Sequence, residues 1–341
     1  MAAPRRILAI TPVDHPGGAE IHLLRLLAAL KQRRWRVTLT SPGAGPLREH
    51  ARQAGYRWYA LPLGGLGPRT GAQAIRSWPK ARLLAGRADV VYLNGGVCGR
   101  LLPALPPGYA RRVLHIHDIV ERVPRMWGRA DVVLADSLAV AQRLQPLTAH
   151  VVYGPVDPDP PAADPPWPAG DGPVVAFVGR IEPRKGVLDL VFAAPAIRRG
   201  APRARIVVVG DDPYASDPAY THQVISSPEI EHYPWVDNAP GLMRHVDVLV
   251  LPSRREPFGT VLAEAMAVGT PVVASRVDGL PEVVRDGLTG RLVAPGDPDA
   301  LAGAVLDVLS HLRRMGEAAR AHGRTFASDR YADHVERLIY G

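Results

Sequence analysis

Short, continuously apolar stretches recur along the chain and alternate with segments of helical periodicity. They occupy residues 5–11, 35–41, 88–94, 111–117, 130–136 and 150–154 in the first half, and 173–179, 204–210, 246–252, 270–275 and 290–295 in the second. Runs that are apolar at almost every position are typical of parallel strands that helices bury on both faces. The alternation therefore predicts an α/β protein built from doubly wound sheets.

The first helical segment, residues 19–34, lies between the first two apolar runs. Its sequence, AEIHLLRLLAALKQRR, places Ile21, Leu24, Leu27 and Ala28 on one stripe. The stripe predicts an amphipathic helix, and the basic residues at its carboxyl end suit the helix dipole.

A proline-rich segment, residues 155–173, separates the two sets of apolar runs. Eight of its nineteen residues are proline, which excludes a central strand or a helix interior. We therefore expect two Rossmann-like domains, residues 1–160 and 161–325, that face a central cleft and are joined by this linker. Residues 326–341 are expected to form a helix that packs back toward the first domain.

The charge and the cysteine content narrow the classes of partner. The net charge is +8, but 6% of residues are aromatic and the arginines are scattered, which argues against nucleic-acid binding. A solvated surface is the simplest interpretation, with anionic membranes or phosphorylated ligands as alternatives. The one cysteine, Cys98, permits no internal disulfide, and no Cys/His cluster has zinc spacing. Without a signal-peptide pattern or a run of about 18 apolar residues, we expect a cytoplasmic protein.

Residues 178–190, VGRIEPRKGVLDL, contain Lys185, one of three lysines in the chain. The preceding apolar run brings Gly179 to the carboxyl edge of its sheet, where open α/β sheets bind ligands. Arg180 offers a guanidinium fork and Lys185 a compact charge, and both suit the oxygens of a diphosphate. Taken alone, this stretch is explained equally well as a solvated turn with incidental charge.

The stretch 253–275 contains two glutamates eight residues apart, Glu256 and Glu264. Glu256 follows an apolar run, and Thr260 is the predicted N-cap of a short helix over residues 260–268. The N–H groups at a helix amino terminus form an anion site. Glu264 is placed to accept two hydrogen bonds from a ribose diol. Taken alone, it is better interpreted as a glutamate that interacts with the helix dipole.

Residues 15–22, HPGGAEIH, follow the first apolar run. Gly17 and Gly18 predict a turn at a helix start that faces the same cleft from the other domain. The chain has no GxGxxG motif, which argues against ordinary dinucleotide binding.

Taken in order along the chain, these motifs resemble the family 4 retaining glycosyltransferases. The shared elements are GGAE at 17–20, HD at 117–118, GRxxxxKG at 179–186, the Glu-x7-Glu of 256–264 with its PFG and AMAxGxPVVAS frame, and GLPEVVRDGLTGRLVAPGD at 279–297. The resemblance covers nearly the whole chain and implies the GT-B fold of two Rossmann-like domains. Within the family, the chain is similar to actinomycete enzymes that decorate antibiotics of the avilamycin type.

The resemblance implies a role for each matching position. It assigns the donor diphosphate to Arg180 and Lys185, the ribose to Glu264, and the donor sugar with its β-phosphate to Glu256. Further donor-binding positions follow in the same way: Gly17, Gly18, Gly179, Phe258, Gly259, Thr260 and Val261.

Three other positions are less settled by the resemblance. His117 resembles the histidine that bonds the donor sugar, with His115 as a competitor on the same strand. The nucleobase is expected near Trp235, Val236 and Asp237. Asp278 departs from the family pattern, because a carboxylate beside a diphosphate would be repulsive unless it turned away.

The reaction that the resemblance implies is transfer of a sugar from a nucleoside diphosphate to a hydroxyl acceptor, with retention of configuration. His117, Arg180, Lys185 and Glu256 form the expected catalytic set, and electrostatic stabilisation of the leaving group requires no metal or other cofactor. The expected acceptor is a natural product or an oligosaccharide intermediate. The acceptor side has three unranked candidates: Asn94, Arg76 and Trp127.

Other functions fit the same sequence. A nucleotide-sugar epimerase of this fold would consume the donor without an acceptor. A non-catalytic sugar-nucleotide or membrane-binding protein, or a transferase with a lipid acceptor, is favoured by the basic stretch KQRRWR at 31–36 beside an amphipathic helix. A solvated helix end is the preferred interpretation of that stretch. The nucleobase, the donor sugar and the oligomeric state are left open.

Overall fold

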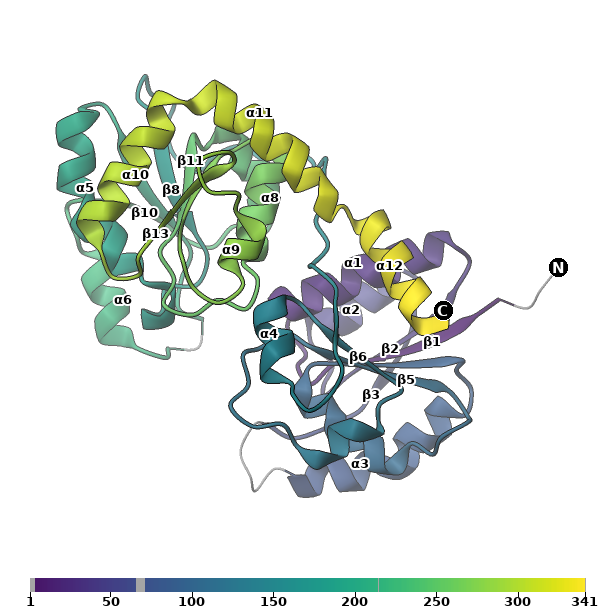
Figure 1. Cartoon of the computed structure of the whole chain (residues 1–341). Helices are drawn as coiled ribbons and strands as arrows, with labels where there is room; N and C mark the ends of the chain where they lie inside the picture. The colour runs from purple at the N-terminus through teal and green to yellow at the C-terminus, as the bar shows by residue number, and fades with distance from the viewer. Residues whose placement is uncertain (1–3, 66–70, 214, 341) are drawn as a thin grey trace. The chain divides into compact units, whose positions relative to one another are not determined.

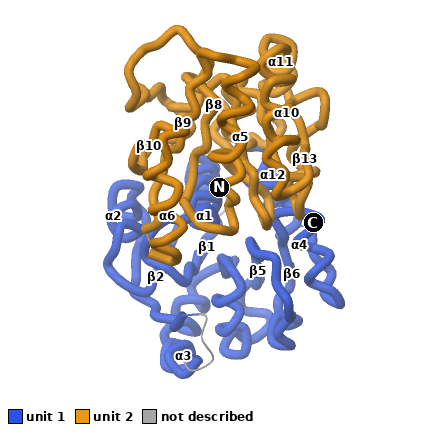
Figure 2. The backbone as a smooth tube through the Cα atoms, turned by 90° about the vertical axis from the view of Figure 1, so that its left-hand side faces the viewer, with its two compact units in different colours: residues 1–155, 328–341 blue, residues 156–327 orange. Residues whose placement is uncertain are grey.

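The computed structural model describes residues 4–65, 71–213 and 215–340 (Figure 1). It forms two compact units, residues 1–155 with 328–341 and residues 156–327, which are coloured separately in Figure 2. Each unit contains one parallel sheet, so the predicted α/β class with two Rossmann-like units is confirmed. None of the helices in the described part of the chain combines the length and the apolar character needed to cross a bilayer.

The sheet of the first unit has seven strands in the order β3-β2-β1-β4-β5-β6-β7. Their bounds are Arg6–Ile10 (β1), Arg36–Ser41 (β2), Arg57–Ala60 (β3), Val90–Asn94 (β4), Arg111–Ile116 (β5), Val132–Ala135 (β6) and His150–Val151 (β7). The central strands β1, β4 and β5 are buried along almost their whole length, which explains their continuously apolar sequences.

Helices and 3-10 segments pack against this sheet. They are Gly18–Gln32 (α1), Pro46–Gln53 (α2), Gly71–Ala85 (α3), Leu138–Arg143 (α4), Gly96–Ala104 (η2) and Arg125–Arg129 (η3). The predicted apolar stripe of α1 is wrong at three of its four positions, because the buried leucines are Leu23, Leu26, Leu27 and Leu30. These leucines form a stripe of their own beside the predicted one, and the core takes that side of the helix.

The last helix, α12 (Ser328–Tyr340), belongs to the first unit and lies against α1 (Figure 1). Its buried face joins the cluster that contains the α1 leucines, and consists of Tyr331, Ala332, Val335 and Ile339. Glu336 accepts hydrogen bonds from Arg33 at 2.5 Å and from the Trp35 indole at 3.0 Å. The end of the chain is therefore fixed to the end of α1 by apolar and ionic contacts.

The second unit has six strands in the order β10-β9-β8-β11-β12-β13. Their bounds are Val174–Val178 (β8), Arg205–Val209 (β9), Glu231–Tyr233 (β10), Val248–Leu251 (β11), Val272–Ser275 (β12) and Gly290–Val293 (β13). The helices are Val187–Gly200 (α5), Pro218–Ile225 (α6), Ala239–Leu242 (α7), Thr260–Val268 (α8), Leu280–Val283 (α9), Pro298–Ser310 (α10) and Leu312–Gly323 (α11). Three short 3-10 turns are Pro183–Lys185 (η4), Met243–His245 (η5) and Arg324–Phe326 (η6).

The proline-rich segment lies on the second unit over most of its length. Trp167 is buried and contacts the ring of Tyr233, with the two ring centroids 5.8 Å apart. The carbonyl of Pro161 accepts a hydrogen bond from the Asn238 amide at 2.9 Å. The extended backbone that proline imposes thus runs along the surface of this unit.

Candidate active site

The residues predicted for the donor side lie at the carboxyl ends of neighbouring strands in the second unit. Trp235 follows β10, Arg180 follows β8, Glu256 follows β11 and Asp278 follows β12. Because these strands are parallel and adjacent in the sheet, their ends meet at one edge. The sheet thus brings together the donor-side residues that the sequence predicted, with Glu264 one turn inside α8.

An ion pair joins Lys185 and Glu256 at this edge. The Lys185 Nζ lies 2.5 Å from Glu256 Oε2, and the Ser253 hydroxyl lies 3.4 Å from the same oxygen. The two charged side chains are 15% and 9% exposed. A cation and an anion are therefore held together where solvent screening is weak, 71 residues apart in sequence.

Arg180 occupies a more open position than Lys185. Its guanidinium is 39% exposed and lies 3.4 Å from Glu182, which also accepts a hydrogen bond from Arg184 at 2.7 Å. Arg180 and Lys185 thus leave the same strand end with different surroundings, one facing solvent and one enclosed.

The backbone around Lys185 requires glycine at position 186. Gly186 has a φ of 66°, and a Cβ there would lie 2.1 Å from the Pro252 carbonyl oxygen. Next to it, the Arg254 N–H donates to the Arg184 carbonyl at 2.8 Å. The loop after β8 is therefore packed directly onto the loop after β11, which brings Lys185 to Glu256.

Asp278 holds the backbone of Glu256. Its Oδ2 accepts a hydrogen bond from the Glu256 N–H at 2.9 Å, and the Gly279 N–H donates to the Glu256 carbonyl at 3.1 Å. Asp278 has a φ of 40°, in the left-handed region that is uncommon for residues other than glycine. The carboxylate that the sequence left unexplained is thus a positioning group for Glu256.

The start of α8 differs from the prediction in one respect. The helix begins at Thr260, but its N-cap is Gly259 with a φ of 82°, so the prediction of Thr260 as the cap is wrong. A Cβ at Gly259 would lie 2.5 Å from Leu280, so this approach needs glycine. Phe258 is buried against Phe326, with ring centroids 5.7 Å apart, and anchors the loop ahead of the helix.

The remaining predicted donor-side residues differ in exposure. Glu264 is buried in α8, whereas Trp235 is 54% exposed and its N–H donates to Asp211 at 2.9 Å. Val236 packs partly against the core and Asp237 is exposed. The indole of Trp235 is thus an aromatic surface available at this edge.

Gly17 and Gly18 lie at the start of α1 in the first unit, Gly17 as N-cap and Gly18 as first helical residue. The Glu20 carboxylate accepts hydrogen bonds from the Gly17 N–H at 3.1 Å and from the Thr11 hydroxyl at 2.9 Å. A Cβ at Gly18 would meet no atom within 4 Å. The helix start is therefore fixed by Glu20 and remains open beside Gly18.

His117 lies at the carboxyl end of β5 within a buried polar network. Its Nδ1 lies 2.8 Å from Asp136 Oδ2, and its Nε2 lies 2.9 Å from Asn94 Oδ1. The Asn94 amide nitrogen faces Glu20 Oε1 at 3.3 Å, so the oxygen of that amide faces His117. Both ring nitrogens of His117 thus face acceptors, which requires both to carry protons.

The charges around His117 favour the same protonation state. Burial lowers the pKa of His117, but the Asp136 carboxylate and then Glu20 and Asp118 raise it, and the net shift is upward. Burial raises the pKa of Asp136, but the charges of His117 and His115 reverse this, so it lies well below its usual range. His117 and Asp136 therefore form a buried imidazolium–carboxylate pair.

His115 takes a different part in the same network. It is fully buried, and burial followed by the charge of His117 lowers its pKa to about 4. Its Nδ1 lies 2.7 Å from the Tyr92 hydroxyl and its Nε2 lies 2.8 Å from Asp136. With 0% of its surface exposed against 7% for His117, His115 lies beneath and supports Asp136.

The structure adds residues that the sequence did not single out and separates others. Glu20 and Asp136 were not predicted to bear on His117; the signal was available, since Asp136 ends an apolar run that pairs with the His117 strand. Of the three unranked acceptor candidates, Asn94 contacts His117. Arg76 lies exposed on α3, and Trp127 is buried.

His22, His117 and Asp136 also have the donor atoms of a metal site, since one atom of each lies within 4.8 Å of the others. Both nitrogens of His117 already have oxygen partners, so we interpret the group as a hydrogen-bonded network. That the reaction needs no metal stays a prediction.

Each unit matches the model of a glycosyltransferase family. Residues 16–160 match Glycosyltransferase Family 4, and residues 172–311 match Glycosyl transferases group 1. Glycogen synthase of Mycobacterium tuberculosis is 37% identical over 156 residues, which are 45% of this chain and 38% of that relative. The match thus covers less than half the length of this curated relative.

Solved structures resemble the chain over almost its whole length. HepE of Anabaena, in complex with UDP and glucose, has a TM-score of 0.82 at 22% identity, covering 98% of each chain. AviGT4, a glycosyltransferase involved in avilamycin A biosynthesis, has a TM-score of 0.71 at 21% identity over 98% of this chain and 97% of that chain. At these identities the likeness shows the GT-B fold alone, so an avilamycin-type role stays a prediction. Together, the family matches and the fold support a glycosyltransferase of the family 4 type.

Proposed function

We propose that this family 4-type chain is a retaining glycosyltransferase, which moves a sugar from a nucleoside diphosphate to a hydroxyl acceptor. The observation that carries the proposal is the enclosed Lys185–Glu256 pair at the carboxyl edge of the second sheet, beside the start of α8. A buried lysine beside a helix amino terminus is a preformed site for an anion.

The diphosphate is the part of the donor that this edge would bind. Arg180 presents an exposed guanidinium, Lys185 an enclosed ammonium, and α8 its first N–H groups. In the protein without donor, Glu256 occupies Lys185. A diphosphate that reaches Lys185 takes over its charge, and Glu256 becomes available to the hydroxyl groups of the sugar.

Retention follows in this proposal from a reaction on one face of the sugar. The acceptor oxygen bonds to the anomeric carbon as the bond to the diphosphate breaks, and the acceptor proton passes to a diphosphate oxygen. Glu256 is the formal alternative as a nucleophile. Its carboxylate already contacts Lys185 and Ser253, and this supports a role in binding instead.

His117 contributes from the first unit as a donor of hydrogen bonds to the sugar. As an imidazolium held by Asp136, it has N–H groups and no lone pair, so it recognises hydroxyl oxygens rather than accepting a proton. Glu264 would hold the ribose and Trp235 would stack on the base. The antibiotic-type acceptor remains the preferred one.

A thermal-shift panel of UDP, GDP, ADP and dTDP tests the proposal. One nucleotide at about 100 times its dissociation constant should stabilise the wild type by roughly 2.7 kcal/mol. Lys185→Ala should lose this shift, while Lys80→Ala, a change at an exposed lysine of α3, should keep it. An equal shift in both variants would contradict the diphosphate site.

The epimerase alternative is separated by an assay of donor consumption. A transferase consumes a sugar nucleotide in proportion to added acceptor and releases the nucleoside diphosphate. An epimerase converts the sugar nucleotide with no acceptor present and leaves the sugar–diphosphate bond intact at the end.

A further inference from the structure

The positive charge of the chain is concentrated in one segment of the first unit. Residues 50–88 contain no aspartate or glutamate, and they contain seven basic residues: Arg52, Arg57, Arg69, Arg76, Lys80, Arg82 and Arg87. The net charge of the whole chain is +8, so this segment alone accounts for most of it. The charge is therefore a local feature, and the helix at its centre is α3.

The exposed face of α3 has an apolar strip with cations on both sides. Ile75, Pro79 and Leu83 are spaced by four residues and lie along one line of the helix, and Ile75 and Leu83 are 56% and 60% exposed. One turn-width to one side lie Arg76 and Lys80, and to the other side Arg82. All three of these basic residues are exposed.

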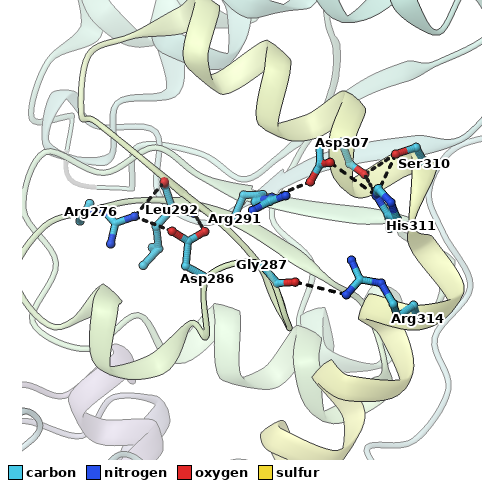
Figure 3. Close-up of polar contacts among 9 residues, drawn as sticks. All are labelled: Arg276, Asp286, Gly287, Arg291, Leu292, Asp307, Ser310, His311 and Arg314. Atoms are coloured by element: carbon cyan, nitrogen blue, oxygen red, sulfur yellow. Dashed lines mark hydrogen bonds and ion pairs between the residues drawn. The ribbon is translucent and has the colours of Figure 1, made fainter.

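The cations of this face have no ion-pair partners within the part of the chain that the structure describes. The second unit differs, because its surface arginines are neutralised by nearby aspartates (Figure 3). Arg276 pairs with Asp286 and Arg291 with Asp307, each at 2.5 Å. The charge on α3 is thus available to an external partner.

The stretch 31–36, which the sequence offered as a membrane contact, is engaged elsewhere. Arg33 pairs with Asp333 and Glu336 of α12, Trp35 is buried, and Lys31 donates to the Ala54 carbonyl. A surface that binds lipid must therefore be sought at another place, and α3 combines the exposed apolar and cationic groups.

We propose that the exposed face of α3, formed by Ile75, Arg76, Pro79, Lys80, Arg82 and Leu83, docks on an anionic lipid bilayer. Cations that flank an apolar strip match the bilayer interface, where the headgroups carry negative charge and the acyl chains lie just beneath. Nucleic acid is the less suitable partner, because its backbone would cover the cations and leave the two aliphatic side chains in contact with charge. The inference does not depend on the proposed transfer reaction.

Sedimentation of the full-length protein with vesicles tests the docking. The wild type should bind vesicles of phosphatidylcholine mixed with phosphatidylglycerol, and should not bind phosphatidylcholine alone. Arg76→Glu/Lys80→Glu should lower the bound fraction at low salt by on the order of tenfold or more, since each cation contributes near such a surface. Arg199→Glu/Arg203→Glu makes the same change in charge at exposed positions of the second unit and should bind like the wild type.

A cysteine label tests the apolar strip separately. Cys98 is fully buried, so a maleimide dye should react selectively with Leu83→Cys. The labelled protein should show a blue shift of dye emission with anionic vesicles. Phe192→Cys, at a side chain on α5 that is 57% exposed, serves as the matched control and should show none.

Three results would overturn the inference. They are equal vesicle binding by Arg76→Glu/Lys80→Glu and the wild type, absence of wild-type binding at low salt, and equal dye shifts at positions 83 and 192. Tighter binding of duplex RNA than of vesicles, abolished by the same charge reversal, would assign the face to nucleic acid. Circular dichroism and melting temperatures should match the wild type for every variant.

Discussion

Lysine at position 185 is explained by the space around its ammonium group. Its side chain is mostly buried, and Nζ lies 2.5 Å from Glu256, in a loop held by the Gly186 backbone against Pro252. A planar guanidinium is longer and wider, so it would displace Glu256 or leave the enclosed position. The residue type is thus set by the close contact between two loops.

We predict that Lys185→Ala lowers turnover with a sugar-nucleotide donor by on the order of 10²–10³-fold, because the leaving group loses a preorganised cation. Lys185→Arg should also lose most of the activity, for steric reasons. Steady-state kinetics measure both effects, and an unchanged far-UV spectrum shows that the fold is kept. Near-normal turnover in Lys185→Ala would refute this role.

The pH dependence of activity should report the Asp136–His117 pair. A raised pKa keeps His117 protonated, so activity that needs the imidazolium is present at lower pH and is lost as pH rises through that pKa. Asp136→Asn removes the main opposing charge, so the alkaline limb of kcat/KM should move to lower pH. Asp118→Asn, at an exposed and weaker contributor, should move it less.

A purely structural role for Asp136 would give a different result. It would lower activity or stability at every pH without moving the alkaline limb, and the shift should also disappear in a His117→Gln background. The pair contributes to stability with the same signs. The His117 contribution is lost as pH rises through its folded pKa, and that of Asp136 as pH falls through its own.

At the scale of elements, the sequence predicted the strands that lie inside each sheet and missed one edge strand in each. The missed strands are β3, RWYA, and β10, EHY, which lie at the same end of the strand order in the two units. Both are short and only half-buried, so they carry no continuous apolar run. An edge strand has a neighbour on one side, and its sequence is therefore under weaker constraint.

The candidate site could be predicted where strand ends and motifs coincide, and not where backbone contacts decide. Glu256 and Lys185 were identified from their motifs. The role of Asp278 depends on a backbone hydrogen bond to a residue 22 positions away, which no local pattern encodes. Glu20 and Asp136 act through His117 and its neighbours, and only the order of the strands brings them together.

Packing of the two loops at Lys185 gives a prediction about Gly186. Gly186→Ala should destabilise the protein by more than about 2 kcal/mol, because a left-handed residue gains a Cβ that meets the Pro252 oxygen. Gly303→Ala, in α10 with no atom near the added Cβ, should be neutral or stabilise by about 0.5–1 kcal/mol. Denaturant midpoints measure both, and equal effects would contradict the packing argument.

At the scale of the whole molecule, the chain crosses from one unit to the other and returns. Residues 156–327 form a unit with its own sheet and core, and α12 then completes the core of the first unit. The stability of the first unit thus depends on a segment that follows the second unit in sequence. The second unit, by contrast, contains its own core within one continuous stretch.

This arrangement predicts a one-sided response to mutation of α12. Val335→Ala/Ile339→Ala removes two fully buried side chains and should destabilise the first unit by about 4–6 kcal/mol. Hydrogen exchange should accelerate in β1, β4 and α1, while β8 and β11 keep wild-type protection, because their core contains no residue of α12. Arg337→Ala, at an exposed position of the same helix, should change neither unit by more than about 0.5 kcal/mol. Equal acceleration in both sheets would mean that the two units unfold together, and that the cores are not independent in energy.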